Sequence, residues 1–108
     1  ILKPKSKDEI FKNFKGRYNA TFKPTEKSAK GTFFKGSINT SYKTLKNLFG
    51  EPREGGVFTQ WILEDDLGNI YTIYNWETPS DWHIGGNINS SPDDLIRYIY
   101  EKSLWEQY

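Results

Sequence analysis

The alternation of apolar and polar residues along the chain predicts five β-strands. In the fourth of these, Ile70, Thr72 and Tyr74 fall on one face because successive strand residues point to opposite sides, and Trp76 continues that face. The polar run 64–69 before this strand is typical of a hairpin turn. The five expected strands cover residues 17–22, 32–38, 57–63, 70–76 and 81–86.

Apolar residues at helical spacing, together with capping signals, predict three helices. Ser6 and Glu9 form a capping box at the start of the first helix, which Gly16 ends. The second helix follows the cap candidates 39–41 and ends before a Gly-x-Pro run. Ser91 begins the third helix, because a proline and two acidic residues follow it directly.

The elements follow the order α-β-β-α-β-β-β-α, which predicts an α+β fold. We expect one mostly antiparallel sheet of about five strands with the helices packed on one face. The sequence contains neither an internal repeat nor a long linker, so residues 1–108 are expected to form a single domain. Only 35% of the residues are apolar but 17% are aromatic, so large rings must supply much of the core. No apolar run reaches the roughly 18–20 residues that a membrane span requires.

Composition excludes several kinds of active site. The chain has no cysteine, which rules out disulfides, thiolate metal sites and cysteine nucleophiles. Its single histidine, His83, would need an orienting acid and a nucleophile or water to act as a general base. The acidic turn 64–66 lacks the spacing of a calcium loop and is interpreted as a solvated tip. We therefore expect no metal, no cofactor and no catalytic activity, with a His83-dependent nucleotide hydrolase as the weakest alternative.

The net charge of +1 conceals a division between the two halves of the chain. Residues 1–54 hold thirteen basic and five acidic residues, whereas residues 55–108 hold two basic and nine acidic residues. One interpretation is that these charges form ordinary solvated faces. The other is a basic patch that attracts an anionic ligand. Long duplex DNA is disfavoured as that ligand, because nine acidic residues would repel its phosphates. The candidate patch comprises Lys23, Lys27, Lys30, Lys35 and Arg53.

Aromatic residues lie among the basic ones and offer flat faces for stacking on nucleobases. The alternative is that these rings fill the core of a small domain. Phe33 and Phe34 are successive residues of one expected strand, so they point to opposite faces. At least one of the two is therefore expected at the surface, at a sheet edge or in an interface. A surplus of aromatic surface without catalytic groups favours binding over turnover.

Five segments within residues 31–87 carry recognisable motifs. They are 31–45, with the pattern GTxxxGxIxTxYKTL, then FGEP at 49–52, Trp61, TIYNW at 72–76 and WHIGG at 82–86. Together these segments resemble a family of small proteins encoded by tailed phages. In function this family is similar to phage anti-CBASS sponge proteins. Those proteins bind the cyclic oligonucleotide messengers of bacterial antiphage defence without cleaving them, as multimers that hold the ligand between subunits.

The resemblance implies an immune-evasion protein of the host cytoplasm that forms a homo-oligomer and sequesters a cyclic oligonucleotide. The alternative is a small phage protein that binds and inhibits a host defence or replication enzyme, with its aromatic and charged residues forming the interface. For the nucleotide ligand we expect rings that stack on bases, cations that hold phosphates, and groups that bond to ligand edges. These are Tyr42, Tyr74 and Trp76 for stacking, Lys35, Lys43 and Arg53 for phosphates, and His83, Gly85 and Gly86 for the edges.

Overall fold

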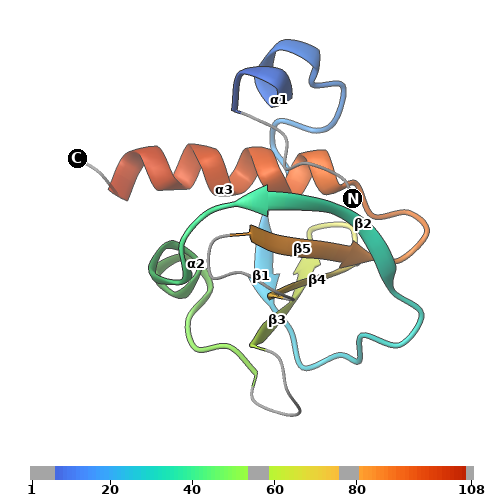
Figure 1. Cartoon of the computed structure of the whole chain (residues 1–108). Coiled ribbons are helices and arrows are strands. Elements are labelled where there is room, and N and C mark those ends of the chain that lie inside the picture. Colours follow the sequence, from blue (N-terminus) through green and yellow to red (C-terminus); the bar gives the residue numbers. More distant parts are fainter. Residues whose placement is uncertain (1–6, 54–58, 76–80, 107–108) are drawn as a thin grey trace.

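The computed structural model describes residues 7–53, 59–75 and 81–106 (Figure 1). Its elements follow the α-β-β-α-β-β-β-α order predicted from the sequence, which confirms the α+β fold. Trp76, one of the residues expected to stack on a base, lies outside the described residues. The elements are α1 (Lys7–Asn13), β1 (Phe22–Pro24), β2 (Phe33–Asn39), α2 (Tyr42–Phe49), β3 (Gln60–Asp65), β4 (Ile70–Asn75), β5 (Asp81–Gly86) and α3 (Pro92–Glu106).

The five strands form one antiparallel sheet in the order β1-β3-β4-β5-β2. Its centre is the meander of β3, β4 and β5, in which Trp61 lies opposite Ile73 and Tyr74 lies opposite His83. β1 and β2 follow each other in the sequence but occupy opposite edges of the sheet. The connection between them must therefore pass from one edge to the other, and it does so on the side away from α3 (Figure 1).

The helices lie on one side of the sheet and form the core with it. α3 runs across the sheet, and α1 packs against α3 on the side away from the strands (Figure 1). Period-two alternation directs one set of strand side chains toward α2 and α3, and these are almost fully buried. The buried strand residues on this face are Phe22, Ile38, Trp61, Leu63, Tyr71, Ile73, Trp82 and Ile84, and they pack with Leu45, Phe49, Leu95, Ile96 and Ile99 of the helices.

The ends of α2 agree with the capping signals in the sequence. The side chain of Ser41 accepts a hydrogen bond from the backbone N–H of Thr44 at 3.1 Å, so it is the N-cap among the three candidates. Gly50 follows the helix with φ of 80°, a conformation that glycine adopts without a steric penalty. Its N–H donates to the carbonyl oxygen of Lys46 at 2.8 Å. α2 is thus terminated by local signals at both ends.

The first predicted strand is wrong for most of its length. β1 begins only at Phe22, and the residues before it form a turn in which the N–H of Ala20 donates to the carbonyl oxygen of Arg17 at 3.3 Å. Ala20 still points into the core, but Tyr18, which the alternation places on the same face, is 60% exposed. The cause is tertiary, because the backbone N–H of Arg17 is bound by Asp94 of α3 at 3.0 Å.

Both edges of the sheet carry features that discourage pairing with other strands. β1 is only three residues long and ends in Pro24, which has no N–H to donate. β2 is interrupted by a bulge at Lys35, between Phe34 and Gly36. A short edge strand, a proline, a bulge and a lysine are all known to protect sheet edges. Across the described ranges, no helix has the length and hydropathy needed to cross a membrane.

Candidate functional site

The face of the sheet turned away from the helices, here called the open face, carries a pocket of about 270 Å³. The residues on this face occupy alternate strand positions, namely Gln60, Ile62, Thr72, Tyr74, His83 and Gly85. Of these, Gln60, Thr72, Tyr74 and Gly85 line the pocket. The β1–β2 connection, residues 25–32, passes over this face and forms one side of the pocket through Ala29 and Thr32. The pocket therefore exists because β1 and β2 lie at opposite edges of the sheet.

The β1–β2 connection is fastened to the sheet at several points. The Nη2 atom of Arg53 donates to the carbonyl oxygens of Thr25 and Lys27, the latter at 3.0 Å. The N–H of Thr25 donates to the carbonyl oxygen of Ile62 in β3 at 3.1 Å. The ammonium of Lys27 lies 2.6 Å from a carboxylate oxygen of Glu64, and this hydrogen bond lowers the pKa of Glu64. The connection is thus a strap with defined anchors.

We expect Arg53→Ala to release this strap. Two charge-assisted hydrogen bonds to backbone carbonyls disappear, each worth about 1.5–3 kcal/mol, while the backbone bond from Arg53 N–H to Gln60 at 2.8 Å is retained. Amide hydrogen exchange should accelerate at Thr25 and Thr32 and remain slow in the β3–β4 pairs. The control is Lys27→Ala, which removes one exposed ion pair and should cause a smaller change. Equal exchange rates in the two variants would show that Arg53 does not anchor the strap.

Aromatic rings form the walls of the pocket. The rings of Phe34 and Tyr74 line it, whereas Phe33 contributes its backbone and turns its side chain to the side of its partner Gly86. Phe33 and Phe34 remain 54% and 41% exposed. The ring centroid of His83 lies 5.1 Å from that of Phe34 and 5.4 Å from that of Tyr74, both edge-on. Burial raises the pKa of Tyr74. The expectation that at least one of the two phenylalanines would be at the surface is therefore confirmed for both.

Gly85 forms the floor of the pocket by having no side chain. A Cβ atom at this position would lie 2.4 Å from Oγ1 of Thr72 and 3.3 Å from the carbonyl oxygen of Phe33. Any other residue would push against Thr72 and fill the space beneath the strap. The backbone of Gly85 faces neighbouring strands on both sides, because β5 lies between β4 and β2. Its contribution is therefore space for a ligand to approach the sheet.

The structure brings together three of the expected site residues, Tyr74, His83 and Gly85, on the open face. A Cβ atom at Gly86 would project to the opposite side of the sheet, where it would lie 2.5 Å from the Cβ atom of Ser90. Tyr42 also lies on the helix side, with its ring centroid 5.7 Å from that of Trp61. Neither Gly86 nor Tyr42 lines the pocket.

The expected phosphate-binding cations do not gather at the pocket. The ammonium of Lys35 donates to the carbonyl oxygen of Ser90 at 2.8 Å and lies 5.1 Å from the ring centroid of Phe33. Arg53 is bound to the carbonyl groups of the strap. Lys43 is exposed on α2, on the other side of the sheet. Two of the three cations thus hold loops in place, and no charged side chain is found among the described residues that line the pocket.

His83 is surrounded by rings rather than by groups that would activate it. Phe34 and Tyr74 pack against its edges, and Ser37 is its partner across the β2–β5 pair. Within the described ranges, no carboxylate is hydrogen-bonded to its ring. A general base requires such an orienting partner, or a substrate that supplies one. The surroundings of His83 therefore suit a contact with a ligand better than proton transfer.

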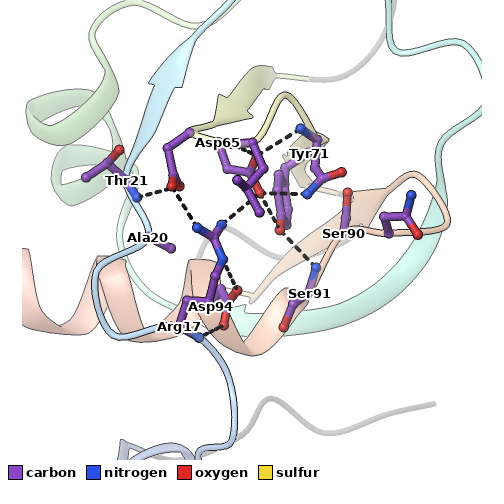
Figure 2. A network of polar contacts seen from close by, with 12 residues as sticks. Arg17, Ala20, Thr21, Asp65, Tyr71, Ser90, Ser91 and Asp94 are labelled. Atoms are coloured by element: carbon purple, nitrogen blue, oxygen red, sulfur yellow. Dashed lines mark hydrogen bonds and ion pairs between the residues drawn. The ribbon is translucent and has the colours of Figure 1, made fainter.

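A second recess, of about 350 Å³, lies beside the acidic turn between β3 and β4. It adjoins the polar network in Figure 2, in which Arg17 contacts three carboxylates. The guanidinium of Arg17 lies 3.4 Å from Asp65, 2.7 Å from Asp66 and 3.9 Å from Asp94. The hydrogen bond from Arg17 lowers the pKa of Asp66, whereas burial raises that of Asp94. These charges are already paired, so this network joins elements of the fold.

The interpretation of the acidic turn as a solvated tip is wrong for Asp65, which is only 4% exposed. One of its carboxylate oxygens accepts the N–H groups of Leu67 and Asn69 at 2.9 and 2.8 Å. The other accepts the hydroxyl of Tyr71 at 3.3 Å. Burial raises the pKa of Tyr71 to about 12, so the phenol stays protonated and donates this bond. The carboxylate organises the turn and joins it to the core.

Sequence reasoning missed Gln60 and Thr72 as site residues, and it considered Phe33 and Phe34 only as general stacking surfaces. A signal for Thr72 was present, because it shares a strand face with Tyr74. Nothing in the local sequence indicates that residues 29 and 32 would lie over that face.

Comparisons of this chain with protein-family models, with curated proteins and with solved structures gave no match. The geometry of the pocket and the chemistry of its lining residues therefore carry the functional argument.

Proposed function

We propose that this protein binds a cyclic oligonucleotide without cleaving it, and that the pocket on the open face receives one base of that ligand. The role is sequestration of a messenger of bacterial antiphage defence by a phage immune-evasion protein. The observation that carries the proposal is a pocket that has the aromatic rings of Phe34 and Tyr74 in its walls and no charged side chain among the described residues that line it. Such rings bind nucleobases by stacking, which is worth about 1–3 kcal/mol per base.

The size of the pocket suits a single base rather than a whole oligonucleotide. Its volume of about 270 Å³ lies just below the range of about 300–1,000 Å³ that is usual for pockets holding drug-sized ligands. The floor at Gly85 and the wall at Phe34 allow a flat group to slide between the sheet and the strap. The sugar and phosphate groups then remain at the mouth, in contact with solvent.

The phosphates would be held at the mouth of the pocket by groups outside its lining. Lys30 is exposed in the strap and lies in the chain between the lining residues Ala29 and Thr32. A second subunit is a further source of cations, and the proposal includes a homo-oligomer for this reason. Binding without cleavage is supported by His83, whose nearest ring contacts are aromatic.

The test is isothermal titration calorimetry with a panel of cyclic di- and trinucleotides, followed by recovery of the ligand after the protein is denatured. We expect micromolar or tighter binding and an intact ligand. Phe34→Ala should weaken binding by about 5- to 150-fold, the equivalent of one lost stacking contact. The control is Leu67→Ala, a 67% exposed apolar residue in the β3–β4 turn, which should leave affinity unchanged.

Two results would reject this function. The first is the absence of binding to any member of the panel at micromolar protein. The second is an equal affinity of the Phe34→Ala and Leu67→Ala variants for a ligand that does bind. Hydrolysis of the ligand by the wild type would instead support the hydrolase alternative, provided that the His83→Ala variant left the ligand intact.

A second candidate, inhibition of a host protein, is favoured by the apolar surface beside β2. Ile88 is 81% exposed, and the ammonium of Lys35 contacts both its carbonyl oxygen at 3.4 Å and the ring of Phe33. Exposed aromatic and aliphatic groups of this kind form the centres of protein interfaces. A stoichiometric bacterial partner that binds the wild type without nucleotide, and is lost on replacement of Phe33 and Ile88, would favour this candidate.

A further inference from the structure

Two uncharged polar side chains, Gln60 and Thr72, line the pocket and have no hydrogen-bond partner among the described residues. Thr72 is buried and Gln60 is half-buried. Neither side chain makes a hydrogen bond to any other residue in the part of the chain that the structure describes. Polar groups in such positions are normally hydrogen-bonded, either to protein or to water. A ligand that displaces water from this pocket must replace the hydrogen bonds that the water made.

Gln60 and Thr72 lie beside the aromatic wall in the sheet. Gln60 is directly opposite Tyr74 in the β3–β4 pair, a position from which side chains interact at about 5 Å. Thr72 is two residues before Tyr74 on the same strand face and is directly opposite Gly85 in β5. A flat group that stacks against Tyr74 above Gly85 therefore has a carboxamide and a hydroxyl within reach of its edges.

We infer that Gln60 and Thr72 select adenine as the base that enters the pocket, an inference that rests on the proposed function. A carboxamide offers one donor and one acceptor side by side. The major-groove edge of adenine presents the complementary acceptor N7 and donor N6, and glutamine pairs with both. The hydroxyl of Thr72 both donates and accepts, so it bonds to a further ring nitrogen of the base.

Guanine is disfavoured at the same edge. It presents two acceptors there, O6 and N7, and the side chains that satisfy both are arginine and lysine. The described residues that line the pocket include neither arginine nor lysine. With Gln60 in place, a guanine leaves the carboxamide oxygen facing another acceptor, which costs affinity.

The experiment measures the affinities of cyclic di-AMP and cyclic di-GMP by calorimetry at one salt concentration. The wild type should bind cyclic di-AMP at least about 10-fold more tightly, the discrimination expected from one bidentate contact. Gln60→Met preserves the volume of the side chain and removes its polar group, so it should abolish the preference. Gln60→Arg supplies two donors and should reverse the preference in favour of cyclic di-GMP.

Thr72→Val is the second variant, because valine has nearly the same shape without the hydroxyl. It should weaken cyclic di-AMP binding about 5-fold or more, whereas the control Thr21→Val, at an exposed position outside the pocket, should not. Equal affinities for the two dinucleotides, unchanged by Gln60→Met, would overturn the adenine inference and leave the proposed function standing. Failure of both dinucleotides, and of every other member of the panel, would reject the inference and the proposed function together.

Discussion

Replacing Asp65 by alanine is expected to destabilise the protein by about 3–5 kcal/mol, because this buried carboxylate satisfies several hydrogen-bond donors and each donor left unpaired costs about 1–3 kcal/mol. The carboxylate accepts hydrogen bonds from Leu67, Asn69 and Tyr71 and lies 3.4 Å from the guanidinium of Arg17. Its loss leaves several donors unpaired in a region with little access to water. Because small domains are stable by only about 5–15 kcal/mol, the variant should be close to unfolding at room temperature.

The measurement is urea denaturation followed by far-UV circular dichroism, with Asp66→Ala as the matched control. Asp66 is the next residue, carries the same charge and also contacts Arg17, at 2.7 Å, but its side chain is exposed. Water replaces the lost bonds at an exposed position, so the control should lose much less stability. Equal losses in the two variants would show that the burial of Asp65 does not matter for the fold.

Trp61→Ala should cost a similar amount, about 3–5 kcal/mol, because it removes the ring at the centre of the aromatic core. The ring centroid of Trp61 lies 5.5 Å from that of Trp82 and 5.7 Å from that of Tyr42. Its Nε1 atom also donates to the carbonyl oxygen of Gly50 at 2.9 Å, which joins the end of α2 to β3. The change therefore removes both a packing contact and a link between the helix and the sheet.

Trp61→Phe separates these two contributions. Phenylalanine retains most of the packing and loses only the bond to Gly50, so we expect a loss of about 1–2 kcal/mol. Urea denaturation measures both variants, and near-UV circular dichroism checks that the remaining aromatic residues are still ordered. A loss below about 1 kcal/mol for Trp61→Ala would contradict a core built around this ring.

The elements that sequence reasoning predicted correctly are those specified by nearby residues. Ser41 caps α2 by accepting a hydrogen bond from the backbone N–H three residues later in the sequence. Pro92 begins α3 and is followed by two acidic residues in the first turn. The alternation in β4 correctly separates the buried Tyr71 and Ile73 from the open face. In each case the physical cause acts within one turn of helix or one strand.

The errors have a common origin in contacts between residues far apart in the sequence. The segment before Phe22 alternates like a strand but is held as a turn by Asp94, which is 77 residues from Arg17. The acidic turn appears solvated from its composition, yet Asp65 is buried by the chain that packs over it. The local sequence around Arg17 does not indicate its contact with Asp94, and the local sequence around Asp65 does not indicate its contact with Arg17.

The candidate site shows the same division. Strand alternation places Tyr74, His83 and Gly85 on one face, because side-chain direction is a local property. The contacts of the basic residues, by contrast, depend on residues that are distant in the sequence. Lys35 and Arg53 satisfy backbone carbonyl groups of loops that reach them only after folding, so their charge is used for structure.

The sequence alone was enough to define the three helices, four of the five strands and the residues of those strands that share a face, since steric and capping effects act between neighbouring residues. The strand order β1-β3-β4-β5-β2 came only from the packing of the whole chain. That order sends the β1–β2 connection across the open face, and the crossing creates the pocket. The site therefore depends on tertiary structure, because a pocket between a strap and a sheet has no counterpart in any single stretch of residues.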